Sequence, residues 1–189
     1  MKRLYFDTET TGFPARNGAP LSECPYIVQL AAILVCDDGG EQLSMNVIIR
    51  PDGWTVPDDA SAIHGISTEK AECFGVPVKV AMAMFSQMAR VADQIVAHNI
   101  AFDRKLIAYE IERLAQVNVI SEKPQFCTME ATTNLCRLPG KYGKFKWPKL
   151  IEAHQHFFNE GFDGAHDALV DVRACHRVHS HLISNKLIP

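Results

Sequence analysis

Two acidic residues, separated by one position, stand at the end of the first apolar stretch of the chain. Asp7 and Glu9 occur in KRLYFDTETTG, residues 2–12, and residues i and i+2 of a strand point to the same face. Two neighbouring carboxylates repel each other, and one takes up a proton unless a cation lies between them. Because Mg²⁺ and Mn²⁺ prefer carboxylate oxygen, the pair indicates a divalent metal site. For such a pair in isolation, two solvated surface acids are the alternative.

A second candidate group is HNIAFD, residues 98–103, where a strand is expected to end and a helix to begin. Asn99 is predicted to be the N-cap of that helix, and its spacing from Asp103 predicts one shared helical face. Asp103 is then placed to reach the end of the first strand. Taken alone, it would also fit an acid in the first turn that the helix dipole stabilises.

The third group is GAHDALVD, residues 164–171. His166 and Asp171 would lie about 140° apart on an ideal helix, so they converge only if His166 lies at or before the first turn. Gly164 permits such an irregular entry. Ala168 is expected to leave room for metal and phosphate. Asp167 is expected to be more exposed and to interact with the helix dipole, so it is left out of the site.

The elements that must position these groups follow from the hydrophobic pattern. After the first strand, further strands are expected at residues 26–35, 42–50, 94–97 and 124–127, the first three strands forming an antiparallel meander. A turn is expected at 63–67, and helical segments at 67–70, 77–92, 99–116, 128–136, 148–158 and 165–186. Strands that come first and then alternate with helices favour an α/β fold, a mixed sheet with helices on both faces.

Composition limits the class of protein. The chain has 189 residues, a formal net charge of −3 and 47% hydrophobic residues, which suits a single domain over residues 1–189. The acidic balance argues against a long duplex held by bulk electrostatics. The six cysteines are scattered, and we see no secretory segment and no apolar run that could span a bilayer, so a reduced, cytoplasmic location is expected.

The segment KYGKFKWPK, residues 141–149, interleaves four lysines with Tyr142, Phe145 and Trp147. Such a segment could guide a single nucleic-acid strand by charge and stacking. It could equally be a solvated loop whose aromatic side chains pack inward. Nearby, His154 lies on the apolar face of the expected helix and is interpreted as a buried core histidine with satisfied hydrogen bonds.

FDTETTG, IHGIS, HNIAFD and HDALVD, in this order and spacing, resemble the DEDDh 3′–5′ exonucleases, the DnaQ-like branch of the ribonuclease-H-like superfamily. The resemblance extends from Arg3 to about Ser180. It implies a ribonuclease-H-like mixed five-stranded sheet flanked by helices. It also implies two divalent cations, Mg²⁺ or Mn²⁺, and a general base. The residues carried over are Asp7, Glu9, Asp103 and Asp171 as metal ligands, with His166 as the base.

The resemblance further implies a set of residues that hold the terminal nucleotides. They are Thr10, Gly12, Phe13, His64, Asn99 and Phe102. The two phenylalanines suit base stacking, which reads no sequence because every base has a π-face. Core packing is the alternative for both rings.

The function expected from this resemblance is hydrolysis of phosphodiester bonds from the 3′ end, releasing nucleoside 5′-monophosphates. DNA trimming or proofreading is favoured over RNA 3′-end trimming, which would depend on contacts to the 2′-hydroxyl. A ribonuclease-H-like endonuclease would use the same metals on internal bonds, and an inactive, polymerase-associated nucleic-acid-binding module would use none. The expected partner is a single-stranded 3′ end, with a polymerase or repair complex as a further partner; the sequence does not indicate the oligomeric state.

Overall fold

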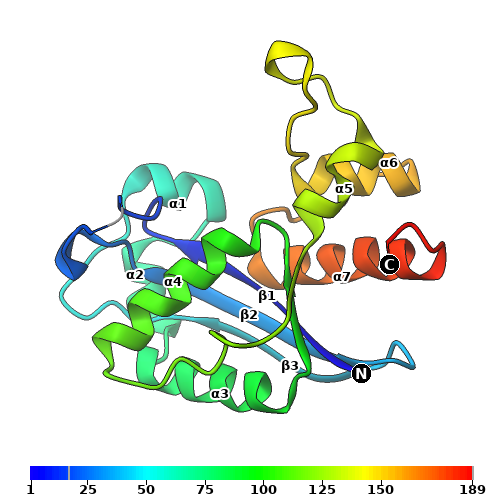
Figure 1. The fold of residues 1–189 in the computed structure, drawn as a ribbon. Coiled ribbons are helices and arrows are strands. Elements are labelled where there is room, and N and C mark those ends of the chain that lie inside the picture. Colours follow the sequence, from blue (N-terminus) through cyan, green and yellow to red (C-terminus); the bar gives the residue numbers. More distant parts are fainter. Residues whose placement is uncertain (17, 189) are drawn as a thin grey trace.

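The computed structural model describes residues 1–16 and 18–188. Within this part of the chain, five strands form one mixed sheet in the order β3-β2-β1-β4-β5 (Figure 1). The strands are β1 (Lys2–Thr10), β2 (Ile27–Cys36), β3 (Glu41–Ile48), β4 (Gln94–Ala97) and β5 (Gln125–Cys127). β1, β2 and β3 are antiparallel neighbours, whereas β4 runs parallel to β1 and β5 parallel to β4. The mixed sheet and its antiparallel meander, both expected from the sequence, are confirmed.

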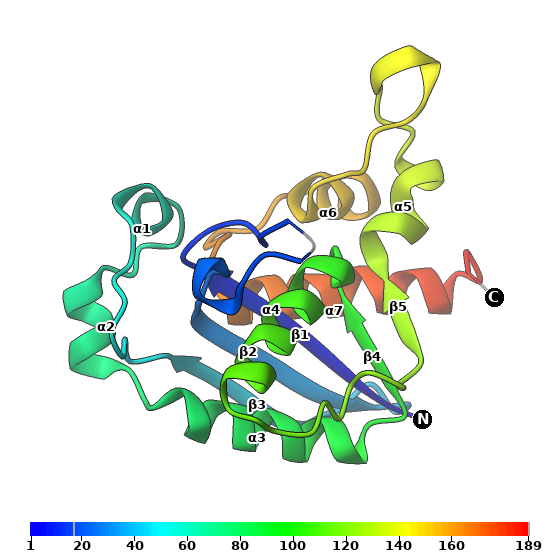
Figure 2. The same cartoon turned by 60° about the vertical axis from the view of Figure 1, so that its left-hand side comes forward.

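Helices cover both faces of this sheet. The α-helices of the described residues are α1 (Asp58–His64), α2 (Thr68–Phe74), α3 (Val78–Val91), α4 (Ile100–Arg113), α5 (Thr128–Cys136), α6 (Leu150–Phe158) and α7 (Ala168–Ser184). α3 and α4 share a core on one face, α7 packs on the other face, and α6 packs on α7 (Figures 1 and 2). The expected α/β class is therefore confirmed. None of the described helices is both long and apolar enough to cross a membrane.

β1 supplies side chains alternately to the two cores, because successive residues of a strand point to opposite faces. Leu4 and Phe6 pack in the core beneath α3 and α4. Tyr5 packs on the opposite face, against α7. Asp7 and Glu9 continue the face of Tyr5, so both carboxylates lie on the side of the sheet that α7 covers.

The segment after β3 contains more helix than the sequence pattern predicts. The turn expected at 63–67 is partly wrong, because Ile63 and His64 form the last turn of α1, which ends at Gly65 with a φ of 69°. This helix is short, and its apolar residue Ile63 is 58% exposed, so it leaves little hydrophobic periodicity. The helical segment expected at 67–70 is confirmed as the start of α2, where the Ser67 hydroxyl accepts a hydrogen bond from the Lys70 N–H.

Two helix boundaries differ from the expectation for reasons of backbone conformation. The helix expected to begin near Ala165 begins later, because Gly164 and His166 have φ values of 80° and 71°, outside the right-handed helical region. α4 ends before the expected Gln116. α3 follows Pro77 and lies within the helical segment expected at 77–92, and one apolar face of it is buried.

Candidate active site

The topology brings three elements to one edge of the sheet. β1 and β4 are parallel, so their carboxyl ends lie at the same edge. α4 begins directly after β4, with only His98 and Asn99 between them. α7 packs against β1 and β2 from the other face. The three predicted groups of site residues, on β1, α4 and α7, therefore meet in space although they are far apart in the sequence.

Asp103 connects α4 to β1. Its side chain is only 2% exposed, and its Oδ1 accepts hydrogen bonds from the Thr8 N–H (3.0 Å) and from the Thr8 hydroxyl (2.8 Å). Burial raises the pKa of Asp103 to about 7, and the two bonds from Thr8 oppose this rise. Asp103 does lie in the first turn of α4, as the alternative role beside the helix dipole requires. It is also buried and held against β1 by Thr8, which a helix-dipole role alone does not account for.

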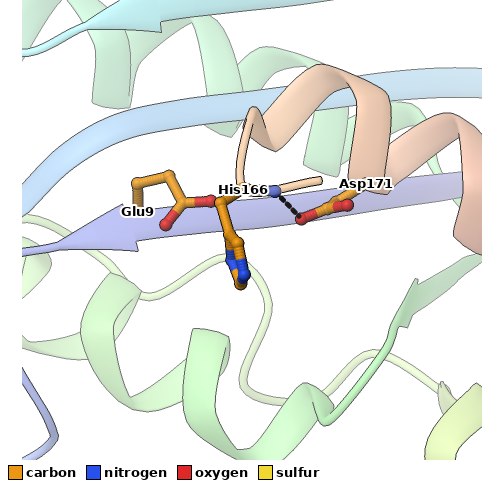
Figure 3. A group of neighbouring side chains, drawn as sticks. All are labelled: Glu9, His166 and Asp171. Atoms are coloured by element: carbon orange, nitrogen blue, oxygen red, sulfur yellow. Dashed lines mark hydrogen bonds between the residues drawn. The ribbon is translucent and has the colours of Figure 1, made fainter. Parts of the chain in front are cut away.

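His166 enters the site from the irregular segment before α7, as the spacing predicted. Ligand atoms of Glu9, His166 and Asp171 all lie within 4.8 Å of one another (Figure 3). The backbone N–H of His166 donates to Asp171 Oδ2 at 3.1 Å, and the φ of 71° at His166 makes this approach possible. The side chain of His166 is exposed, so its imidazole lies at the rim of the acidic group.

Electrostatics shows that the four predicted carboxylates act on one another. The pKa of Asp7 lies well above its ordinary value, because of burial and then because of the charges of Asp103, Asp171 and Glu9. Burial and the neighbouring acids raise the pKa of Glu9 to about 8. Burial raises that of Asp171 to about 6. Carboxylates that repel one another in a partly buried site are a donor set that fits hard divalent cations, because the cations remove the repulsion.

Asp167 meets its expectation in part, whereas Ala168 does not have the role expected of it. Asp167 caps α7, since its Oδ1 accepts from the Leu169 N–H (3.0 Å) and the Val170 N–H (3.3 Å). The expected role at the helix end is thus confirmed, but Asp167 is only partly exposed, and its charge raises the pKa of Asp7. Ala168 is fully buried in the core between α7 and the sheet, so its small side chain permits close packing there rather than opening space for phosphate.

The residues expected to hold nucleotides begin at the end of β1. Thr10 closes a tight turn, because its hydroxyl donates to the Gly12 carbonyl (2.7 Å) and accepts from the Gly12 N–H (3.3 Å). Phe13 is 88% exposed, so core packing is the wrong interpretation of this ring. Phe102 packs partly on the core, and its ring meets Phe13 edge to face, with centroids 6.3 Å apart.

Asn99 and His64 also lie near this group. Asn99 occupies the N-cap position of α4, but it has φ 69° and ψ 48°, and its side chain makes no capping hydrogen bond. The N-cap position is the expected one, but with this left-handed backbone the regular spacing of a helix does not by itself place Asn99 on the face of Asp103. The pKa of His64 is lowered overall, mainly by burial and also by the nearby His166, and a hydrogen bond to the Thr10 carbonyl opposes this shift. His64 is thus brought toward the end of β1.

Three residues that support the site were not singled out from the sequence. Thr8 holds Asp103 through its N–H and its hydroxyl. Gln29 on β2 bonds the start of α7, donating from Nε2 to Asp167 Oδ2 (3.3 Å) and accepting at Oε1 from the Ala168 N–H (3.3 Å). His98, directly after β4, is partly buried; loss of solvent around its ring lowers its pKa to about 4, and its Nε2 donates to the Pro148 carbonyl at 2.9 Å. Only Thr8 carried a local signal, a hydroxyl between two acids.

A separate cavity of about 620 Å³ lies beside α3 and α4. Its wall includes Tyr26 and Trp54, whose rings are stacked with centroids 5.0 Å apart, and Arg113 lies over the Tyr26 ring at 3.8 Å. None of the residues predicted for the active site lines this cavity. The acidic group is therefore distinct from it.

Comparisons with known proteins bear on the family and the fold of this chain. The model of a family described as exonuclease matches residues 4–179. An uncharacterized exonuclease of Escherichia phage 186 is 27% identical over 180 residues, covering 90% of this chain and 82% of the relative. A structure of exonuclease I has a TM-score of 0.79 at 17% identity, covering 98% of this chain and 42% of that chain.

A zinc-bound form of the E. coli exonuclease I–single-stranded DNA complex has a TM-score of 0.76 at 18% identity, with 98% of this chain and 41% of that chain covered. This chain thus spans less than half of the length of these exonuclease I chains. At this low identity the likeness to them shows the fold alone, the mixed five-stranded sheet with helices on both faces. The match to the family model extends over nearly the whole chain and places it among nucleic-acid-binding hydrolases. This protein belongs to the exonuclease family.

Proposed function

We propose that this protein is a 3′–5′ exonuclease that removes nucleoside 5′-monophosphates one at a time from single-stranded DNA. The observation that carries the proposal is the convergence of four carboxylates from three elements, beside an exposed histidine. The carboxylates are Asp7, Glu9, Asp103 and Asp171, and the histidine is His166. Membership of the exonuclease family supports the reaction class.

The carboxylate set fits two divalent cations, Mg²⁺ or Mn²⁺, which is the composition implied by the resemblance. When bound, these cations supply activation of the attacking water and stabilisation of the departing 3′ oxygen. The protein's part is to hold the ligands. Thr8 fixes Asp103 against β1, and the His166 N–H fixes Asp171 at the start of α7.

The imidazole of His166 is proposed as the general base. It is exposed at the rim, beside Glu9 and Asp171, where a water that attacks phosphorus would lie. Because its backbone N–H already holds Asp171, the same residue would position one ligand and accept the proton of the water. This double role follows from the left-handed conformation at His166.

The terminal bases are proposed to stack on Phe13, which Phe102 supports from the side. Thr10, Gly12, His64 and Asn99 would contact the same nucleotides. DNA is favoured because a structural neighbour holds single-stranded DNA. A polymerase or repair partner and a cytoplasmic location stay predictions from the sequence.

The test is digestion of single strands that carry a label at the 5′ or the 3′ end, in Mg²⁺ or in EDTA. We expect the 3′ label to appear at once as a mononucleotide, the 5′-labelled strand to give a descending ladder, and EDTA to stop both. Circular single-stranded DNA should stay intact. Cutting of the circle would show an endonuclease. Early release of the 5′ label would show that digestion proceeds from the 5′ end. Faster digestion of RNA of the same sequence would show that the enzyme is an exoribonuclease.

A further inference from the structure

A hairpin formed by residues 137–149, called the arm here, projects away from the sheet beyond α5 and α6 (Figures 1 and 2, yellow). It is closed by backbone hydrogen bonds from the Lys146 N–H to the Leu138 carbonyl (3.0 Å) and from the Gly140 N–H to the Lys144 carbonyl (2.9 Å). The arm is therefore a paired hairpin and not an extended loop.

The arm exposes its aromatic side chains. Tyr142 is 97% exposed, Trp147 66% and Phe145 44%, so inward packing, one of the two interpretations left open by the sequence, is wrong. Tyr142 also has φ 55° and ψ 35°, a conformation that is uncommon for a bulky residue. An aromatic residue held in this conformation and packed against nothing is unusual for a purely structural turn, and such outliers gather at functional segments.

The charge of the arm is entirely positive. Residues 137–149 contain one arginine and four lysines and no acidic residue, although the whole chain has a net charge of −3. Lys146 pairs with Glu152 at the base of the arm, at 2.5 Å. Lys141 and Lys144 are exposed near the tip, on either side of Tyr142. Exposed rings between exposed cations are the combination that binds single-stranded nucleic acid.

The arm rises from the same edge of the sheet as the acidic group. Near the end of the arm, the carbonyl of Pro148 accepts a hydrogen bond from His98 Nε2 at 2.9 Å. His98 stands between β4 and α4, the helix that carries Asp103. Because β4 is parallel to β1, the base of the arm and the carboxylates share one edge, and a strand that ends in the site can continue toward the arm.

We propose that the arm grips single-stranded nucleic acid upstream of the terminal nucleotide, with Tyr142 and Trp147 stacked on unpaired bases and Lys141 and Lys144 at phosphates. The position of the grip relative to the reacting end rests on the proposed function. A duplex fits this grip poorly, because the faces of its bases are already stacked. Very short strands that end inside the active site do not reach the arm.

Binding is tested first without hydrolysis, in EDTA, by the fluorescence of Trp147. The chain has two tryptophans, and the other, Trp54, is partly buried in a stack with Tyr26. We expect a long single-stranded oligothymidylate to quench the wild type and the Trp54→Phe variant, and blunt duplex DNA to leave both unchanged. Trp147→Phe should lose the signal and still bind, because a ring remains. Unchanged Trp147 fluorescence at saturating single-stranded DNA would overturn the proposal.

Kinetics then test the effect on capture. In Tyr142→Ala with Lys141→Ala and Lys144→Ala, kcat/KM on long single strands should fall roughly tenfold or more while kcat changes little. The slope of log(kcat/KM) against log[salt] should become shallower by about 1.4, because two phosphate contacts at about 0.7 each are lost. On dinucleotide substrates the variant should equal the wild type.

The matched control is Lys79→Ala with Arg90→Ala, which removes two exposed charges from α3 on the opposite side of the sheet. This control should behave like the wild type. If it lost as much kcat/KM as the arm variant, the effect would come from the total positive charge of the protein and not from the arm, which would overturn the proposal. If the arm variant hydrolysed long single strands as fast as the wild type, the proposed role of the arm would be wrong, while the proposed exonuclease activity would stand. The same conclusion would follow if the arm bound an acidic peptide and did not bind DNA. Quenching without any hydrolysis would overturn the proposed exonuclease activity and leave the grip standing.

Discussion

Addition of Mg²⁺ to the metal-free protein should release protons. Burial and mutual repulsion raise the pKa values of the clustered carboxylates, so we expect part of the group to carry protons at neutral pH. A cation binds the ionised form, so binding must displace these protons. The amount released therefore measures how strongly the acids are gathered in one site.

The pKa values set the size of this release. The pKa values of Glu9, Asp103 and Asp171 are about 8, 7 and 6. At pH 7 these groups hold about 0.9, 0.5 and 0.1 of a proton, respectively. The release is thus about 1.5 protons per protein, and Asp7, whose pKa is also raised, adds to it. Above about pH 9.5 the release from these three groups should approach zero.

Calorimetric titration with Mg²⁺ in buffers of different ionisation enthalpy gives the number of protons directly. The Glu9→Gln variant should release about one proton fewer at pH 7, since its amide cannot ionise. Asp163→Asn, which removes an exposed acid outside the predicted site, is the control and should match the wild type. Metal binding at pH 7 without proton release would refute the clustering of the acids.

Three further predictions concern the same residues. Asp7→Ala should abolish metal-dependent hydrolysis and melt at a higher temperature than the wild type in EDTA, because one repelling acid is removed; a near wild-type rate would contradict its role. His166→Ala should lose about 10²- to 10⁴-fold in kcat with little change in KM and retain metal binding by calorimetry; unaltered kcat would remove it from the reaction. The metal-free protein should lose stability as pH rises from about 4 to about 8. Over this range the raised carboxylate pKa values make the folded state bind more protons than the unfolded chain. A melting temperature in EDTA that increases with pH would contradict this.

Local spacing predicted the parts of the site that depend on local geometry. The alternation of β1 placed Asp7 and Glu9 on one face, and the spacing of His166 and Asp171 required an irregular entry to the last helix, which the structure has. The left-handed conformation of Asn99 was not predictable, because asparagine at a helix start usually caps with its side chain.

Contacts between distant residues leave no such pattern. The bonds from Thr8 to Asp103 join residues 95 positions apart, and those from Gln29 to the start of α7 join residues 138 and 139 positions apart. Composition also did not decide whether the aromatic rings of the arm face inward, because that depends on whether a neighbouring surface is available to cover them. In each case tertiary packing, which the local sequence does not encode, determined the outcome.

The position of the metals is the central claim, and anomalous diffraction from crystals soaked in Mn²⁺ tests it most directly. We predict two anomalous peaks about 4 Å apart among Asp7, Glu9, Asp103 and Asp171, each within about 2–2.3 Å of a carboxylate oxygen. Asp7→Ala crystals should lose at least one peak. Peaks that are coordinated by other acidic residues, with none among these four carboxylates, would contradict the assignment of this site.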